Sequence, residues 1–166
     1  MKAQAIRIPD LAREVCPLEN IGYEDAFSID IPTPMMTKKY SAEKWAYEIF
    51  ANAPPAINQI VSQSWNTLGF KSKSESHWQS LESATMIKQD DLIMMVVHSD
   101  SVDIQICMVI NLIESQLIFS SFFSHGHKWF STPTLKMMTV PHRFIAPYLL
   151  NTAAERMKLK SYIFIV

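Results

Sequence analysis

Hydrophobic and polar residues alternate most regularly between Val102 and Ile113. Residues of one parity are all apolar, namely Val102, Ile104, Ile106, Met108, Ile110 and Leu112. The opposite parity begins with Asp103 and Gln105. Because successive side chains of a β-strand point to opposite faces, this pattern predicts a strand with one strongly apolar face. We expect Ile104, Ile106, Met108 and Ile110 to be buried on that face, with Asp103 and Gln105 directed the other way.

The same hydrophobic region is not expected to cross a membrane. Apart from histidine, Glu114 is the only charged residue from Ile104 to His127, so hydropathy alone would suggest a span. A carboxylate in the middle of a membrane helix costs roughly 2.5 to 3.5 kcal/mol, and Gln105 and Asn111 would lie in the same helix. The alternation therefore favours two strands joined near Glu114.

Further short segments with strand-like patterns surround this region. They cover residues Tyr23–Ile31, Leu81–Lys88, Leu92–Ser99, Gln116–Ser124 and Leu135–Val140. The connections between the central strands are only a few residues long, which favours an antiparallel meander.

Three segments predict helices, in addition to a helical turn before Pro17. The first covers Ala42–Phe50, with a serine directly before it as N-cap. Two prolines precede the second, and Gly69 is placed to end it. The third begins at Pro141 and runs to about residue 157; Pro147 within it predicts either a kink or a later start.

The order of these elements is typical of a helix-grip-like α+β fold. A strand is followed by two short helices, an antiparallel meander and a long C-terminal helix, around which the curved sheet would wrap. The 166 residues are close to the commonest length of one domain, so we expect a single domain over residues 1–166.

Composition and charge narrow the possible partners. Hydrophobic residues make up 48% of the chain. Its 15 basic and 16 acidic residues nearly balance, and no long run of like charges occurs. We therefore expect no nucleic-acid binding. Cys16 and Cys107 are far apart and form no zinc or redox motif. Charged residues interrupt the first fifteen positions, which argues against a signal peptide and for a cytoplasmic protein.

Three segments also resemble a known family. They are GYEDAFSIDIP, EIFANAPPAINQIVSQSWNTLGF and VPHRFIAPYLLNTAAER, which lie between Gly22 and Arg156. They are similar to a bacterial family of unknown function whose members occur alone or fused behind short-chain-dehydrogenase-like domains. The resemblance implies a helix-grip fold, as in the START and plant pollen-allergen superfamily, and it supplies no reaction.

The histidines are the main candidates for chemistry. His125 and His127 would share one face of a strand, at a separation compatible with a metal, but the intervening Gly126 suggests a bulge or turn. We expect that they do not bind metal together. His142 either packs at the entrance of the last helix or provides a proton donor or acceptor at a cavity mouth. No nucleophile elbow, phosphate-binding loop or dinucleotide fingerprint is present, so no cofactor is expected.

The element order predicts a cavity between the sheet and the final helix. We expect it to be lined by some of Trp45, Ile57, Trp65, Met94, Ile106, Met108, Phe119, Phe123, Phe144, Tyr148 and Leu149, with His142 at its mouth. The leading hypothesis is the binding of a small, mostly apolar molecule there. The alternatives are a cyclase, isomerase or dehydratase that uses a histidine or aspartate of the cavity, and a structural module that forms a homodimer through the apolar C-terminal tail or an edge strand.

Overall fold

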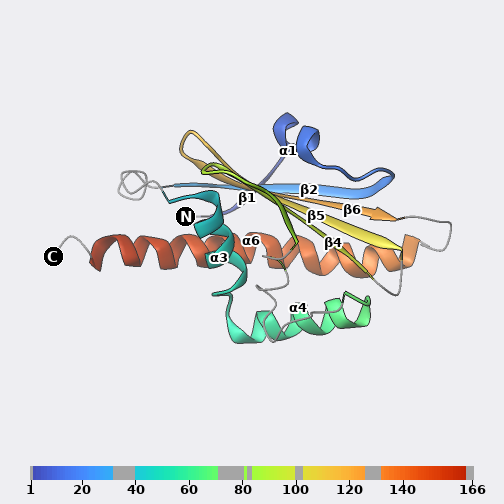
Figure 1. Ribbon diagram of the computed structural model, residues 1–166. Coiled ribbons are helices and arrows are strands. Elements are labelled where there is room, and N and C mark those ends of the chain that lie inside the picture. The colour runs from blue at the N-terminus through green and yellow to red at the C-terminus, as the bar shows by residue number, and fades with distance from the viewer. Residues whose placement is uncertain are drawn as a thin grey trace.

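The computed structural model describes residues 2–31, 40–70, 81, 84–99, 103–125 and 132–163, with the backbone alone for 132–137 and 159–163. In chain order (Figure 1) the elements are β1 (Gln4–Ile6), α1 (Asp10–Val15), β2 (Ile21–Asp30), α3 (Ala42–Phe50), α4 (Pro55–Thr67), β3 (Thr85–Lys88), β4 (Leu92–His98), β5 (Ile104–Ile113), β6 (Gln116–His125) and α6 (Thr132–Ile163). The α+β fold predicted from the sequence is confirmed, with a curved antiparallel sheet, two short helices after β2 and a long C-terminal helix packed on the sheet.

All neighbouring strands of the sheet are antiparallel, in the order β1-β2-β6-β5-β4-β3. The predicted meander is confirmed as β3 to β6. A short turn at Glu114, whose φ is 53°, joins β5 to β6. β2 then pairs with β6 over nearly its whole length, although the paired residues Asp25 and Ser121 are 96 positions apart in the sequence. The edge strand β1 was not predicted, because three residues carry too little pattern.

Both faces of the central strands are buried. On one face Ile104, Ile106, Met108 and Ile110 are at most 4% exposed, as predicted. Asp103 is exposed in the bend before β5, and Gln105 within the strand is half-buried. The opposite face continues with apolar residues that pack beneath α1, and Figure 1 shows α1 and α6 on opposite sides of the sheet. The expectation of a single apolar face was therefore incomplete, because the N-terminal segment with α1 covers the second face of the sheet.

The helix α6 begins earlier than predicted. Residues Leu135–Val140 were expected to form a strand, but they lie inside α6, which runs through Pro141 and Pro147. A short, mostly apolar segment of this length fits a strand and a helix equally well. The deciding signal is Pro133 directly after Thr132, since proline is favoured in the first turn of a helix.

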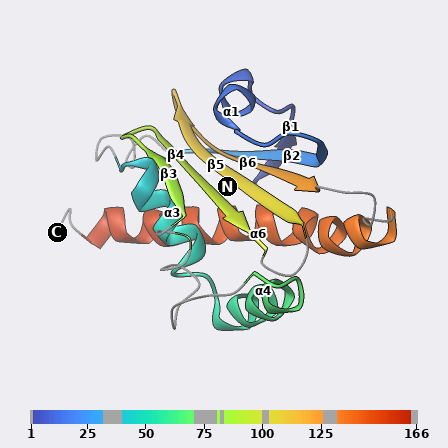
Figure 2. The same cartoon turned by 45° about the vertical axis from the view of Figure 1, so that its right-hand side comes forward.

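The two short helices follow their sequence signals. The hydroxyl of Ser41 accepts a hydrogen bond from the backbone N–H of Lys44 and caps α3, as expected. The helix α4 starts at Pro55 and ends at Thr67, two residues before Gly69, whose φ of 75° is the left-handed conformation that glycine favours. No residue of α4 is buried, and Figure 2 places this helix at the periphery, on the side of the sheet that α6 covers.

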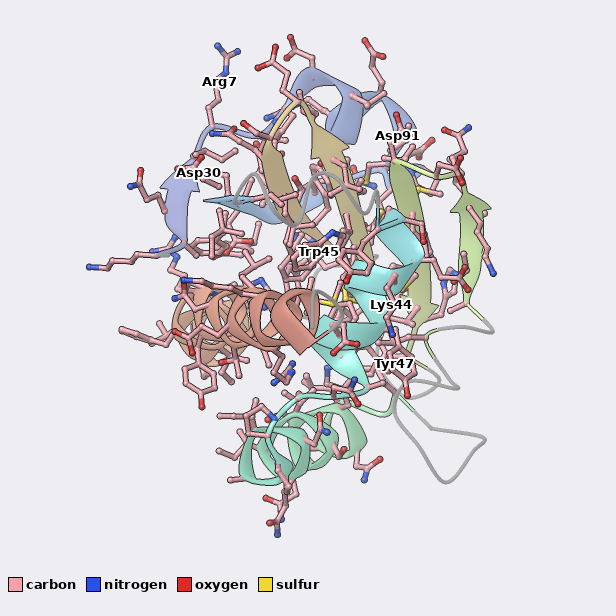
Figure 3. All side chains as sticks on the ribbon, turned by 90° about the vertical axis from the view of Figure 1, so that its left-hand side faces the viewer. Arg7, Asp30, Lys44, Trp45, Tyr47 and Asp91 are labelled. Atoms are coloured by element: carbon pink, nitrogen blue, oxygen red, sulfur yellow. The ribbon has the colours of Figure 1, made fainter. Side chains whose placement is uncertain are left out.

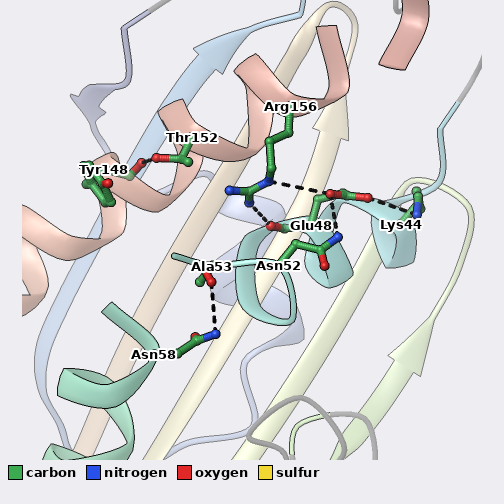
Figure 4. A network of polar contacts seen from close by, with 8 residues as sticks. All are labelled: Lys44, Glu48, Asn52, Ala53, Asn58, Tyr148, Thr152 and Arg156. Carbon is green, nitrogen blue, oxygen red and sulfur yellow. Dashed lines mark hydrogen bonds and ion pairs between the residues drawn. The ribbon is translucent and has the colours of Figure 1, made fainter. Parts of the chain in front are cut away.

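The helix α3 is anchored both by an apolar side chain and by a buried charge. Figure 3 shows Trp45 directed from α3 toward the interior, where it is 1% exposed, while Tyr47 lies on the outer side. The carboxylate of Glu48 is fully buried; it accepts a hydrogen bond from Asn52 at 2.9 Å and lies 3.0 Å from the Lys44 ammonium. Arg156 of α6 donates to the backbone carbonyl of Glu48, so this network joins α3 to α6 (Figure 4).

Candidate functional site

A cavity of about 120 Å³ lies between the sheet and α6. Its walls come from four parts of the fold. The sheet contributes Ile106, Met108, Phe119 and Phe123; α6 contributes Met138, Pro141, His142, Ile145, Ala146 and Leu149; α3 and α4 contribute Phe50, Val61, Ser64 and Trp65. The lining is mostly apolar, and His142 is the only titratable side chain that the described residues contribute to it.

Seven residues that were expected around a cavity do line it. They are Trp65, Ile106, Met108, Phe119, Phe123, His142 and Leu149. The alternation in β5 and β6 identified four of them, because residues of one parity share the face beneath α6.

Five other expected residues do not line this cavity. Trp45 and Ile57 pack in or against the same hydrophobic core. Met94 belongs to the cluster on the opposite face; β4 is apolar at almost every position, so its pattern does not show which residues face the cavity. Phe144 and Tyr148 are 73% and 46% exposed.

The exposure of Phe144 and Tyr148 follows from the helical repeat of α6. Each lies one residue before a cavity residue, Ile145 and Leu149 respectively, and one residue turns a helix by about 100°. The sequence therefore contains two apolar stripes on α6. The structure buries only the stripe that includes Ile145 and Leu149.

His142 lines the cavity and lies among aromatic rings. Its ring centroid is 5.3 Å from that of Phe123 and 6.1 Å from that of Phe119, in edge-to-face arrangements. Its Nε2 lies 3.3 Å from Oδ1 of Asp25 on β2. Nδ1 has no hydrogen-bond partner among the described residues. The structure thus pairs a cavity histidine with a carboxylate. This arrangement is the one that the enzyme alternative requires.

Asp25 is held by a second partner. Oδ2 of Asp25 accepts a hydrogen bond of 2.6 Å from the hydroxyl of Tyr23, and the Tyr23 oxygen accepts one of 3.0 Å from Nε of Arg143. Burial, followed by this hydrogen bond to Asp25, raises the pKa of Tyr23 to about 12. A continuous polar chain therefore runs from Arg143 at the surface through Tyr23 and Asp25 to His142 at the cavity.

The sequence pattern around Asp25 already indicates that this residue is unusual. Tyr23, Asp25, Phe27 and Ile29 share one parity of β2, so a carboxylate stands on the face that is otherwise aromatic or aliphatic. A buried carboxylate in such a position requires a hydrogen-bonding partner. The sequence could not show that this partner is His142, 117 residues later.

A second polar residue occupies the same row of the sheet. Ser121 of β6 is paired with Asp25 on one side and with Met108 on the other. It is 1% exposed, and its hydroxyl has no hydrogen-bond partner among the described residues. An unpaired buried hydroxyl is unfavourable by roughly 1 to 3 kcal/mol, so this position is not optimised for stability.

His98 and His125 are not among the residues that line the cavity. His98 is exposed at the end of β4, and His125 is the last residue of β6. His127 lies outside the described residues. In the part of the chain that is described, no three metal-ligating side chains come together. The expectation that His125 and His127 do not share a metal stays a prediction.

The two cysteines come together on the face of the sheet that α1 covers. Cys107 of β5 is fully buried, and Cys16, which follows α1, packs against the same cluster. The hydrogen bond from the Cys107 thiol lowers the pKa of Cys16 to about 7 and raises that of Cys107. The spacing of the cysteines in the sequence gave no indication of this contact.

Comparisons with family models, with curated proteins and with solved structures find no match to this chain. The resemblance to a bacterial family of unknown function therefore stays a prediction. None of the helices within the described ranges is both long enough and apolar enough to cross a membrane.

Proposed function

We propose that this protein binds a small, mostly apolar molecule in the cavity between the sheet and α6. The observation that carries the proposal is a mostly apolar cavity with two polar residues, Ser64 and His142, in its described lining. Binding sites for small molecules typically combine apolar walls with a few polar groups that orient the ligand.

The volume of the cavity limits the size of the ligand. About 120 Å³ is close to the roughly 150 Å³ of an engineered protein cavity that accepts benzene. Burial of roughly 200 Å² of apolar surface contributes about 5 kcal/mol before the cost of association is subtracted. We therefore expect a single-ring molecule to bind with a submillimolar Kd at best.

The test is to fill the cavity. Replacement of Met108 by Trp places an indole in the space of a thioether, so binding of toluene, followed by NMR titration, should be lost. Met86 on β3 is 62% exposed, and Met86→Trp is the matched control that should bind toluene as the native protein does. Circular dichroism checks that both variants are folded, because overpacking costs roughly 1 to 3 kcal/mol. Retained binding in Met108→Trp, or no binding in the native protein, would contradict the proposal.

A second candidate function is acid–base catalysis on the bound molecule. It is favoured by the contact between His142 and Asp25, since a histidine oriented by a carboxylate is a common general base. The assay is exchange of the α-hydrogens of cyclopentanone for deuterium. We expect the protein to accelerate this exchange and His142→Gln to abolish the acceleration, whereas equal rates in both proteins would exclude this function for that probe.

A further inference from the structure

The polar chain that ends at His142 determines which of its ring nitrogens carries a proton. Arg143 can only donate hydrogen bonds, so the Tyr23 oxygen accepts one from it. The Tyr23 hydroxyl then donates its own hydrogen to Asp25. The Asp25 carboxylate can only accept hydrogen bonds, so Nε2 of His142 carries the hydrogen and donates it to Oδ1. In a neutral imidazole the other nitrogen, Nδ1, is then an acceptor.

Because Nδ1 is a hydrogen-bond acceptor, it restricts the chemistry of the ligand, whereas the cavity volume restricts only its size. Among the described residues, no other titratable side chain lines the cavity, and the hydroxyl of Ser64 donates to the carbonyl of Ile60 in its own helix. The Ser64 oxygen can still accept a hydrogen bond, so the polar side chains of the described lining are Ser64 and His142. Nδ1 of His142, which has no hydrogen-bond partner among the described residues, is the acceptor on this histidine that is left for a bound molecule. A hydroxyl group satisfies this acceptor, while an ether, ketone or nitrile leaves it unpaired.

We propose that the ligand is an uncharged single-ring molecule with one hydroxyl group, a phenol or a cyclic alcohol, whose hydroxyl donates to Nδ1 of His142. This inference rests on the proposed function, because it requires that the cavity be occupied. Asp25 acts as a positioning residue, since it touches the histidine and sets its tautomer. Tyr23 and Arg143 in turn orient Asp25.

The experiment compares three probes of similar size at pH 8, where imidazole is ordinarily neutral. Phenol offers a donor, benzonitrile offers only an acceptor, and toluene offers neither. In the native protein we expect the affinity for phenol relative to toluene to be at least tenfold higher than in His142→Phe. Toluene should still bind in that variant, because its walls remain apolar.

Replacement of Asp25 by Asn provides the sharper test. The Tyr23 hydroxyl still requires an acceptor, so the amide oxygen of the new side chain should face Tyr23 and its NH₂ group should face His142 Nε2. His142 would then carry its proton on Nδ1 and become a donor toward the cavity. We expect the preference to invert, so that benzonitrile binds more tightly than phenol. Arg13→Ala, which removes an exposed ion pair with Glu24 on the same strand, is the control that should leave the preference unchanged.

The outcomes separate this inference from the proposed function. Binding of toluene with the same relative affinity for phenol in the native protein and in His142→Phe would overturn the inference and leave the proposed function standing. A preference for phenol that persists in a folded Asp25→Asn protein would overturn it as well. If Asp25→Asn does not fold, the comparison with His142→Phe decides alone. If none of the three rings binds to the native protein, both proposals fail.

Discussion

The unpaired hydroxyl of Ser121 leads to an unusual expectation, that removal of a buried polar group stabilises the protein. Ser121→Ala deletes a hydroxyl that has no partner in the described part of the structure and is buried beside Met108. An unsatisfied buried hydroxyl is unfavourable by roughly 1 to 3 kcal/mol, and the small loss of packing offsets part of the gain. We expect the free energy of unfolding to rise by about 1 kcal/mol, or about 2 to 4 °C in Tm.

Ser124 on the same strand is the matched control. It is also buried, at 7% exposed, but its hydroxyl donates a hydrogen bond to the backbone carbonyl of Glu19. Ser124→Ala should therefore lower the free energy of unfolding by about 1 kcal/mol. Because both changes replace serine by alanine in β6, differences in strand propensity largely cancel.

Urea denaturation, followed by tryptophan fluorescence, measures both variants against the native protein. The expected result is opposite signs, with a difference of about 2 kcal/mol between the two variants. If Ser121→Ala destabilises the protein as much as Ser124→Ala does, the Ser121 hydroxyl has a hydrogen-bonding partner in solution. The account of this row of the sheet would then be refuted.

Three further changes test other parts of the structure. Glu48→Ala should destabilise the protein by about 2 kcal/mol in urea denaturation, because it removes the buried carboxylate that binds Asn52 and the partly exposed cations of Lys44 and Arg156. Glu43→Ala removes an exposed ion pair and should change stability by less than about 1 kcal/mol. The alkylation rate of Cys16 by iodoacetamide should rise to half its maximum near pH 7, and Cys107→Ala should move this midpoint upward because it removes the hydrogen bond that lowers the pKa. Burial raises the pKa of Tyr23 from 10 to about 12, so the contribution of this tyrosine to stability should be present below pH 10 and lost between pH 10 and 12. The Tyr23→Phe variant should therefore lose less stability over that range than the native protein does. Equal losses in the two proteins would contradict this assignment.

The predictable part of the fold is the part that local pattern determines. The alternation in β5 placed Ile106 and Met108 on the core face, and Ser41 and Gly69 marked the ends of helices. These features depend on neighbours a few residues away, through the strand repeat and the capping hydrogen bonds. A sequence records such information directly.

The site itself depends on long-range pairing, which local pattern does not record. His142 was a candidate, but its partner Asp25 lies on a strand that reaches it only through the pairing of β2 with β6. The face that Met94 occupies was also undetermined, because continuous apolar runs carry no alternation. The thiol contact between Cys16 and Cys107 likewise requires the N-terminal segment to cross the sheet.

The shallow packing of α4 would affect how long a molecule of the proposed kind stays in the cavity. Val61 and Trp65 form part of the wall, yet no residue of α4 is buried, so little hydrophobic free energy holds this helix in place. Backbone amides of α4 should therefore exchange with solvent through local opening, well before those of β5. The dissociation rate of a bound molecule would then follow the opening rate of this one helix and not the global stability of the sheet.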